Sequence, residues 1–385
     1  MDRRDPLERA AVLETLQLLV VTPSVNPTLA PGEPTGTGEA AIAGVIRDWF
    51  SAHGVECWLE EAAPGRPNAI ARVGSGAGPA LVFCAHVDTV STEGMTIPPF
   101  EPRVEGNRLY GRGSYDMKGG AAAILCAMAK LAKEPLGGSV TAALVADEEY
   151  ASIGTQHFVA NHKADACIVT EPCDGKLILA HKGFVWAEIT TEGHAAHGSR
   201  WDIGVCAIAR MGRIIAALDE FDRTQLRART HPLVGPASQH CSTVRGGAGL
   251  STYAPSCTLE VERRTIPGES PQQVLDELRT VIGAAGEEAI VRLMLTQPPL
   301  VCPRDARVAQ CVRDAATQVT GRAPVEGGVA YWMDAALFAA AGMETVNYGA
   351  DGAGAHEAVE WGDLDSVVTC AHVLVESALR YCKRP

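Results

Sequence analysis

Apolar and polar residues alternate along the chain in blocks that predict strands and helices in turn. Over about the first 180 residues, short apolar runs bounded by turn residues are typical of buried strands, and longer amphipathic stretches are typical of helices. We expect helices near residues 6–20, 36–53 and 119–133, and strands at 68–73, 80–88, 140–146 and 166–172. Strands that alternate with helices in this way predict an α/β domain of three layers.

The middle of the chain has a different pattern. Its predicted elements are strands at 183–193, 257–266 and 289–297, and helices near 202–219 and 270–285. Two strand–helix–strand units in succession predict a small α+β domain of the ferredoxin-like kind. The first pattern then returns, with helices at 304–319, 333–341 and 363–382 and a strand at 344–349. We therefore expect a discontinuous domain of residues 1–180 and 298–385, interrupted by an inserted domain of residues 181–297.

Composition narrows the class of protein. The 385 residues are 46% hydrophobic and 21% charged, which suits two globular domains. A net charge of −13, without a long Lys/Arg cluster, argues against nucleic acid and membrane surfaces as partners and favours a small-molecule substrate. No apolar run reaches 18 residues, and we expect a cytoplasmic protein. The twelve cysteines form no CxxC pair, so we expect reduced core residues, with disulfides as the alternative.

The segment "LVFCAHVDTV", residues 81–90, places two polar residues at the end of an apolar strand. Ligand sites of α/β sheets lie beyond the carboxyl ends of their strands, and His86 lies at such an end. His86 could offer a ring nitrogen to a metal ion, while Asp88 accepts the other ring N–H and fixes the tautomer. A loop histidine that is merely hydrogen-bonded is the alternative interpretation of this segment taken alone.

Further strand ends and adjacent loops carry carboxylates or imidazole. Asp116 lies between glycines before a helix, where it could also be an N-cap. Glu148 and Glu149 follow an apolar strand, and a solvated acidic turn is the alternative there. Glu171 follows the next strand, and His356 follows a glycine-rich loop. Oxygen and nitrogen donors without thiolate suit two divalent ions, of which Zn²⁺, Co²⁺ and Mn²⁺ are the candidates.

The sequence also resembles the co-catalytic zinc metallopeptidases and amidohydrolases that include acetylornithine deacetylase, succinyl-diaminopimelate desuccinylase, aminoacylase and glutamate carboxypeptidase. The matching segments run in the family's order through nearly the whole chain: "HVDTV", "GRGSYDMKGG", "ADEE", "TEP", "VERRTIPGE" and "GAHEAVEW". The resemblance implies a zinc-peptidase-like catalytic domain whose inserted domain serves as a lid and for dimerisation.

The same resemblance implies a role for each candidate residue. His86 and Glu171 would hold one metal ion, Glu149 and His356 would hold the other, and Asp116 would bridge the two. Glu148, beside a ligand but not itself coordinating, would be the general base that takes a proton from water and passes it to the departing amine.

Two residues of the inserted domain complete the implied site. His197, in "TEGHAAHGSR", matches a lid histidine that stabilises the oxyanion across a dimer interface, and His194 is the weaker candidate for this role. Arg264 lies where relatives bind the substrate's carboxylate, although a structural salt bridge is an equal alternative. Arg263 beside it is expected on the other face of the strand.

The sequence departs from the family pattern at two places that face substrate. Tyr331 and Trp332 precede Asp334 where a glycine-rich run with a small hydroxyl residue is usual, and "GLSTYAPS" lacks an asparagine that is common in the lid. We therefore expect a homodimeric, metal-dependent hydrolase of N-acyl amino acids, similar to acetylornithine deacetylase. A carboxypeptidase or dipeptidase that cleaves short peptides is the alternative within the family, and an inactive binding homologue is the alternative outside it.

Overall fold

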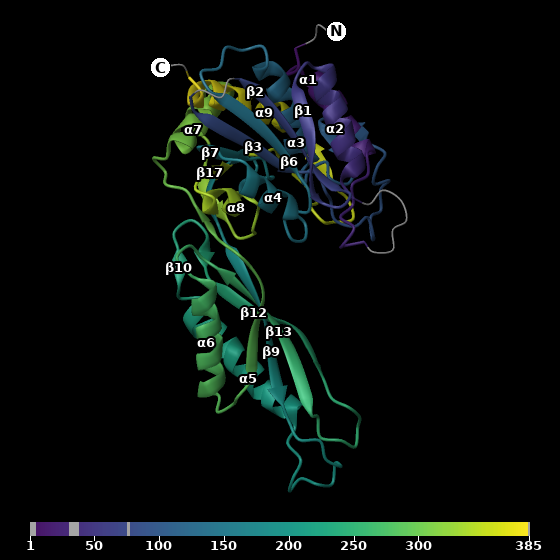
Figure 1. The fold of residues 1–385 in the computed structure, drawn as a ribbon, viewed down its shortest axis with the longest axis vertical. Coiled ribbons are helices and arrows are strands. Elements are labelled where there is room, and N and C mark those ends of the chain that lie inside the picture. Colours follow the sequence, from purple (N-terminus) through teal and green to yellow (C-terminus); the bar gives the residue numbers. More distant parts are fainter. Residues whose placement is uncertain (1–4, 31–37, 75–77, 384–385) are drawn as a thin grey trace. The chain divides into compact units, whose positions relative to one another are not determined.

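The computed structural model describes residues 5–30, 38–74 and 78–383 (Figure 1). The chain forms two compact units. The first consists of residues 1–179, 302–327 and 333–385, and the second consists of residues 180–301 and 328–332. Each unit is built around its own apolar core.

A mixed sheet forms the centre of the first unit, and its strands lie side by side in Figure 1. In spatial order they are β1 (Glu56–Ala63), β2 (Arg66–Gly74), β6 (Ser139–Val145), β3 (Ala80–His86), β7 (Ala166–Val169), β17 (Glu344–Asn347) and β8 (Leu177–His181). The four strands from β6 to β17 are parallel, whereas β1, β2 and β8 pair antiparallel with their neighbours. The last residues of β8, Ala180 and His181, belong to the second unit, where they pair with the short strand β15 (Leu300–Val301). The short strand β16 (Glu326–Val329) also pairs with β8.

Helices cover both faces of this sheet. They are α1 (Arg9–Val21), α2 (Ala40–Ala52), α3 (Lys118–Leu131), α4 (Ile153–Asn161), α7 (Arg307–Thr320), α8 (Ala335–Ala340) and α9 (Leu364–Tyr381). Along β3, Leu81 and Phe83 join the main core with α3, while Val82 and Cys84 are buried on the opposite face, because successive side chains of a strand alternate between faces. The predicted three-layer α/β architecture is therefore confirmed.

The second unit has one antiparallel sheet of four strands. Its elements follow the chain as β9 (Gly183–Glu192), α5 (Ala207–Phe221), β12 (Ser238–Gly246), β13 (Ser256–Thr265), α6 (Pro271–Ala284) and β14 (Ile290–Gln297). The strands lie in the order β12, β13, β9, β14, and residues of α5 and α6 share a core with alternate residues of β9 and β13. This βαββαβ succession is the ferredoxin-like arrangement that the sequence predicts.

Several small elements complete the two units. The second unit contains the short π-helical segment Asp222–Leu226 and the strands β10 (Thr230–His231) and β11 (Gly235–Pro236). The first contains a small sheet of β4 (Arg103–Glu105), β5 (Arg108–Tyr110), β19 (Trp361–Asp363) and β18 (Gly352–Ala353).

The predicted elements differ from the observed ones mainly at their ends and at the edges of the sheets. The helix expected from residue 202 begins at Ala207, and β1, α4 and β12 are absent from the prediction. All twelve cysteines are free; eight of them are buried and four are half-buried. Over the described part of the chain, none of the helices has the length and apolar character required to span a membrane.

Candidate metal centre

The polar residues at the strand ends meet at one edge of the large sheet. His86 is the last residue of β3, Glu148 follows β6, and Glu171 follows β7. Because β6, β3 and β7 are adjacent and parallel, their carboxyl ends lie together. Asp116, in the loop before α3, and His356, after β18, lie beside them.

The carboxylate of Asp116 lies between two imidazoles. Its Oδ1 is 3.2 Å from His86 Nε2, and its Oδ2 is 3.4 Å from His356 Nε2. Further out on each side, Glu171 Oε1 is 3.6 Å from His86 Nε2, and Glu149 Oε2 is 3.1 Å from His356 Nε2. Each oxygen of Asp116 therefore faces a different histidine, and each histidine faces one further carboxylate.

Two groups of these side chains are close enough to hold a metal ion. In each group, ligand atoms from all three residues lie within 4.8 Å of one another, and the groups are His86, Glu148 and Glu171, and His86, Asp116 and Glu149. Both groups contain only oxygen and nitrogen donors, which suits Zn²⁺, Co²⁺ or Mn²⁺.

The protonation equilibria of the centre show an excess of buried negative charge. Burial raises the pKa of Glu148 and of Glu171 well above the usual range, and neighbouring carboxylates add to the rise. Burial and the charge of Asp116 likewise raise the pKa of Glu149. The pKa of His86 is raised despite its burial, because Glu171 and Asp116 favour the imidazolium. Carboxylates that repel one another in this way are stabilised by a cation.

The donor atoms of the centre fit a metal ion. Glu149 Oε1 is buried and has no hydrogen-bond partner within the described chain, which is costly for a carboxylate oxygen unless a cation is bound. The Nδ1–H of His86 donates to the backbone carbonyl of Asp88 at 3.0 Å, so that Nε2 is the ring nitrogen that faces the carboxylates. This is the orientation in which a neutral imidazole can ligate a metal.

The side chain of Asp88 binds the loop that follows β6. Its Oδ1 accepts from the backbone N–H of Glu148 at 3.1 Å, and its Oδ2 accepts from that of Glu149 at 3.2 Å and from Asn26 Nδ2 at 2.8 Å. The Oδ1 of Asp88 is 3.5 Å from His86 Nδ1, further than the carbonyl oxygen of the same residue. Asp88 thus contacts His86 chiefly through its backbone and orders Glu148 and Glu149 through its carboxylate.

A second network, which the sequence did not indicate, supports the same loop. Asp147 has a positive φ of 71° and accepts from Asn26 Nδ2 at 3.0 Å and from Arg66 Nη1 at 2.7 Å. Arg66 also donates from Nε to Glu39 at 2.8 Å. The partners lie up to 121 residues apart in sequence, and no local pattern connects them.

Asp334 is a further buried carboxylate of the first unit. Its Oδ2 accepts from the hydroxyl of Thr155 at 2.5 Å, and its Oδ1 is buried without a hydrogen-bond partner among the described residues. Burial raises the pKa of Asp334 to about 6. It thus adds to the negative charge that surrounds Glu148.

The two predicted residues of the inserted domain belong to the second unit. His197 is exposed, and its Nδ1 lies 2.9 Å from the hydroxyl of Ser199. The guanidinium of Arg264 lies 5.4 Å from the centre of the Phe184 ring, and its Nη2 is 2.9 Å from Glu262 Oε1. The structural salt bridge expected as the alternative for Arg264 is therefore present.

Arg263 and Arg264 are consecutive residues of β13, so their side chains lie on opposite faces of the sheet. Arg263 is 1% exposed and pairs with Glu269 and Glu277 beneath α6, on the face opposite Arg264. Trp332 packs edge-on against Phe184 at 5.9 Å and donates to the carbonyl of Pro298 at 3.0 Å. Trp332, which departs from the family pattern, and Arg264 therefore both contact Phe184.

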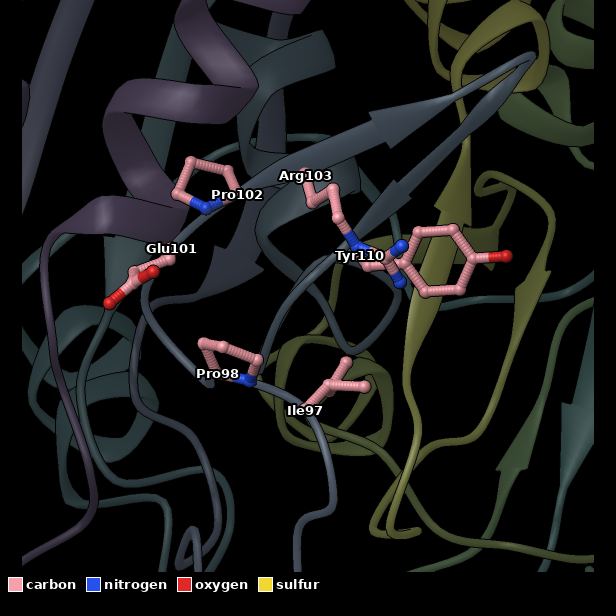
Figure 2. Close-up of a pocket in the computed structure, with 6 residues that line it drawn as sticks. All are labelled: Ile97, Pro98, Glu101, Pro102, Arg103 and Tyr110. Carbon is pink, nitrogen blue, oxygen red and sulfur yellow. The ribbon is translucent and has the colours of Figure 1, made fainter.

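A separate hollow of about 430 Å³ lies near the strands β4 and β5 (Figure 2). Its lining residues are Ile97, Pro98, Glu101, Pro102, Arg103 and Tyr110. The guanidinium of Arg103 lies 4.8 Å from the centre of the Tyr110 ring, and the two side chains overlap in this view. None of the residues of the candidate metal centre lines this hollow, which is therefore distinct from it.

Comparison with known proteins identifies the family. The family model described as peptidase family M20/M25/M40 matches residues 82–380, a span that contains every residue of the candidate centre. The chain belongs to peptidase family M20/M25/M40. This confirms the family that the sequence motifs indicate, and it makes the protein a hydrolase of amide bonds.

Several members of this family are similar to the chain. The acetylornithine deacetylase of Vibrio cholerae is 31% identical over 264 residues, which cover 67% of this chain and 69% of that protein. Among solved structures, the aminopeptidase PepT of Bacillus cereus has a TM-score of 0.79 at 18% identity and covers 98% of this chain and 99% of its own. A dinuclear metal binding peptidase of Bacillus subtilis has a TM-score of 0.75 at 17% identity, with 98% and 99% covered. Members of family M20/M25/M40 thus share the fold of the whole chain.

Proposed function

We propose that this protein is a dinuclear metal-dependent amidohydrolase that removes an N-acyl group from an amino acid with a free carboxylate. The observation that carries the proposal is the position of Asp116, whose two oxygens face two different histidines. A carboxylate in that position can bridge two cations. The relative that is an acetylornithine deacetylase favours an N-acetyl amino acid as substrate.

Each side chain of the centre has a role in this proposal. His86 and Glu171 hold one divalent ion, Glu149 and His356 hold the other, and Asp116 is shared. When bound, the two ions supply Lewis acidity that polarises the scissile carbonyl and acidifies water. Zinc is the first candidate because the donors are imidazole and carboxylate, with cobalt and manganese as further candidates.

Glu148 is the proposed general base. Its carboxylate takes a proton from the attacking water and delivers that proton to the nitrogen of the departing amine. In the metal-free chain, burial and the neighbouring Glu171 raise the pKa of Glu148; two bound cations would oppose that rise and keep the carboxylate ionised for the first step. The hydrogen bond from its backbone N–H to Asp88 fixes the position of the residue while the side chain changes protonation.

The second unit supplies further proposed residues. Arg264 binds the carboxylate of the substrate in a bidentate manner, in exchange for its contact with Glu262. His197 donates to the oxyanion from a second copy of the chain. The hydrogen bond of His197 to Ser199 uses Nδ1, so Nε2 remains available for this contact.

This role of His197 requires a homodimer, which we propose forms through the second unit. The second unit exposes apolar side chains in the segment that follows His197, at the start of α5, and on β12 and the loop after it, namely Trp201, Ile203, Val205, Ile208, Val244 and Leu250. Trp201 is 81% exposed, which is unusual for so large an apolar side chain and is typical of a protein interface. β12 is also an edge strand of its sheet and offers unpaired backbone groups to a second copy.

A substrate panel tests the proposed function. The zinc-loaded protein is assayed with N-acetyl amino acids and with dipeptides, and the same protein is assayed after removal of metal by a chelator. We expect hydrolysis of N-acetyl amino acids that is lost on chelation and restored by zinc. Faster turnover of dipeptides would identify a peptidase instead, and no turnover of either class would favour a binding homologue.

A further inference from the structure

Glu360 lies four residues after His356, and none of its side-chain surface is exposed. Its carboxylate accepts four hydrogen bonds. Oε1 accepts from the backbone N–H groups of Tyr115 and Asp116, both at 3.0 Å. Oε2 accepts from Arg112 Nη1 at 2.8 Å and from the backbone N–H of Gly113 at 3.0 Å.

Backbone contacts join the same two segments. The carbonyl of Glu360 accepts from the N–H of Gly111 at 3.2 Å, and the carbonyl of Glu357 accepts from Arg112 Nη2 at 3.3 Å. The segments 111–116 and 356–360 are therefore held together from end to end. They carry Asp116 and His356, whose side chains meet at 3.4 Å.

We propose that Glu360 is a positioning residue that fixes Asp116 and His356 relative to each other and thereby sets the affinity of the centre for its metal ions. This inference rests on the proposed function, because it takes both residues as metal ligands. Glu360 does not coordinate metal itself. It acts through the backbone of the loop that presents Asp116, and partners of this kind change metal affinity by about 10- to 100-fold.

The pattern of hydrogen bonds requires a carboxylate and not merely a polar side chain of the same size. Each oxygen of Glu360 accepts from two N–H donors. A glutamine has one acceptor oxygen and one NH₂ group, so that either orientation of the amide turns the NH₂ toward two N–H donors. Glu360→Gln therefore keeps the shape of the side chain but loses the hydrogen bonds to two of the four N–H donors.

The test compares Glu360→Gln with Glu357→Gln. The control removes a negative charge from the same loop, at a residue whose side chain is exposed. Affinity for Zn²⁺ is measured by competition with a chromophoric chelator, and the unfolding temperature is measured separately on metal-free protein. We expect Glu360→Gln to bind zinc 10- to 100-fold more weakly than wild type, with kcat largely restored at saturating zinc. Glu357→Gln should match wild type.

The outcomes separate this inference from the proposed function. If Glu360→Gln binds zinc like wild type and loses only unfolding temperature, Glu360 is structural and the inference is wrong, while the proposed function stands. If wild-type protein binds none of Zn²⁺, Co²⁺ and Mn²⁺, the proposed function itself fails. Should Glu360→Gln not fold, Glu360→Asp replaces it. The shorter side chain keeps the charge opposite Arg112 but does not reach both pairs of donors, and unchanged zinc affinity in that variant would equally overturn the inference.

Discussion

Arg66 joins two carboxylates that are otherwise buried. The side chains of Glu39 and Asp147 are 0% and 2% exposed, and that of Arg66 is 13% exposed. Arg66 donates from Nε to Glu39 at 2.8 Å and lies 2.7 Å from Asp147 through Nη1. One planar guanidinium thus compensates two charges at once, and Asp147 directly precedes Glu148 in the loop of the metal centre.

We predict that Arg66→Met lowers the free energy of unfolding of the metal-free protein by about 3–5 kcal/mol at pH 7. This is the cost of leaving buried charges without their partner, and it is a large share of the ~5–15 kcal/mol that stabilises a typical domain. Arg66→Lys is the matched control. Its ammonium keeps the charge but does not reach both carboxylates, so we expect a smaller loss of about 1–3 kcal/mol, typical of unmade hydrogen bonds.

The free energy of unfolding that Arg66→Met loses should also depend on pH. Burial already raises the pKa of Glu39, and the hydrogen bond from Arg66 opposes that rise. Without Arg66 the folded-state pKa of Glu39 rises further above its unfolded value. A carboxyl whose pKa is raised on folding lowers the free energy of unfolding at every pH above its unfolded pKa, which is near 4.5. This cost grows by up to about 1.4 kcal/mol per pH unit and stops growing once the pH passes the folded-state pKa. The variant should therefore lose less stability at pH 5 than at pH 7.

Urea denaturation followed by far-UV circular dichroism measures both effects. Because the chain has two units, we compare the transition that reports the first unit in each variant and do not assume a single two-state step. A loss below about 1 kcal/mol for Arg66→Met at pH 7 would contradict the reasoning, since surface ion pairs contribute that little. Equal losses at pH 5 and pH 7 would show that Glu39 is not left charged and buried in the variant.

Three further predictions concern individual side chains. Glu148→Gln should bind two equivalents of zinc by elemental analysis but turn over substrate about 10²- to 10⁴-fold more slowly; a loss of bound zinc would instead make Glu148 a ligand. His197→Ala should keep its metal and lower kcat about 10²- to 10³-fold, and mixing it with Glu148→Gln should restore activity on subunit exchange; no recovery would remove His197 from a neighbouring site. Burial lowers the pKa of Lys118 to about 7, so this side chain binds fewer protons in folded, metal-free protein than in unfolded protein between about pH 7 and 10. The stability of wild type relative to Lys118→Met, measured by urea denaturation, should therefore rise with pH across that window, and a constant difference would contradict the lowered pKa.

The fold could be predicted from the sequence where strands are buried on both faces. β3 and β6 are nearly continuous apolar runs, and such runs identify central strands of an α/β sheet. The strand β12 was missed because it is an edge strand whose exposed residues are mostly polar, as in "SQHCSTVRG". The helix α4 was missed because "IGTQHFVAN" has few apolar residues and only Phe158 among them is large and buried.

The candidate ligands could be predicted because their chemistry is unusual for their positions. His86 and Glu171 interrupt or follow apolar strands, where charged groups are rare without a function. Arg66 and Glu360 could not be predicted in the same way. Arginine and glutamate are ordinary surface residues, and Glu360 becomes significant only when the fold brings it to Asp116, 244 residues earlier in the chain.

Buried carboxylates that accept backbone N–H groups support the metal centre on two sides. Asp88 accepts from the N–H groups of Glu148 and Glu149, and Glu360 accepts from that of Asp116. Because the donors are backbone groups, substitutions in the supported loops leave these bonds in place, whereas replacing either carboxylate by its amide removes acceptors from several donors at once. The two anions also add to the negative potential around the candidate ligands. We therefore expect a carboxylate-to-amide exchange at either Asp88 or Glu360 to weaken cation binding through geometry and through charge together.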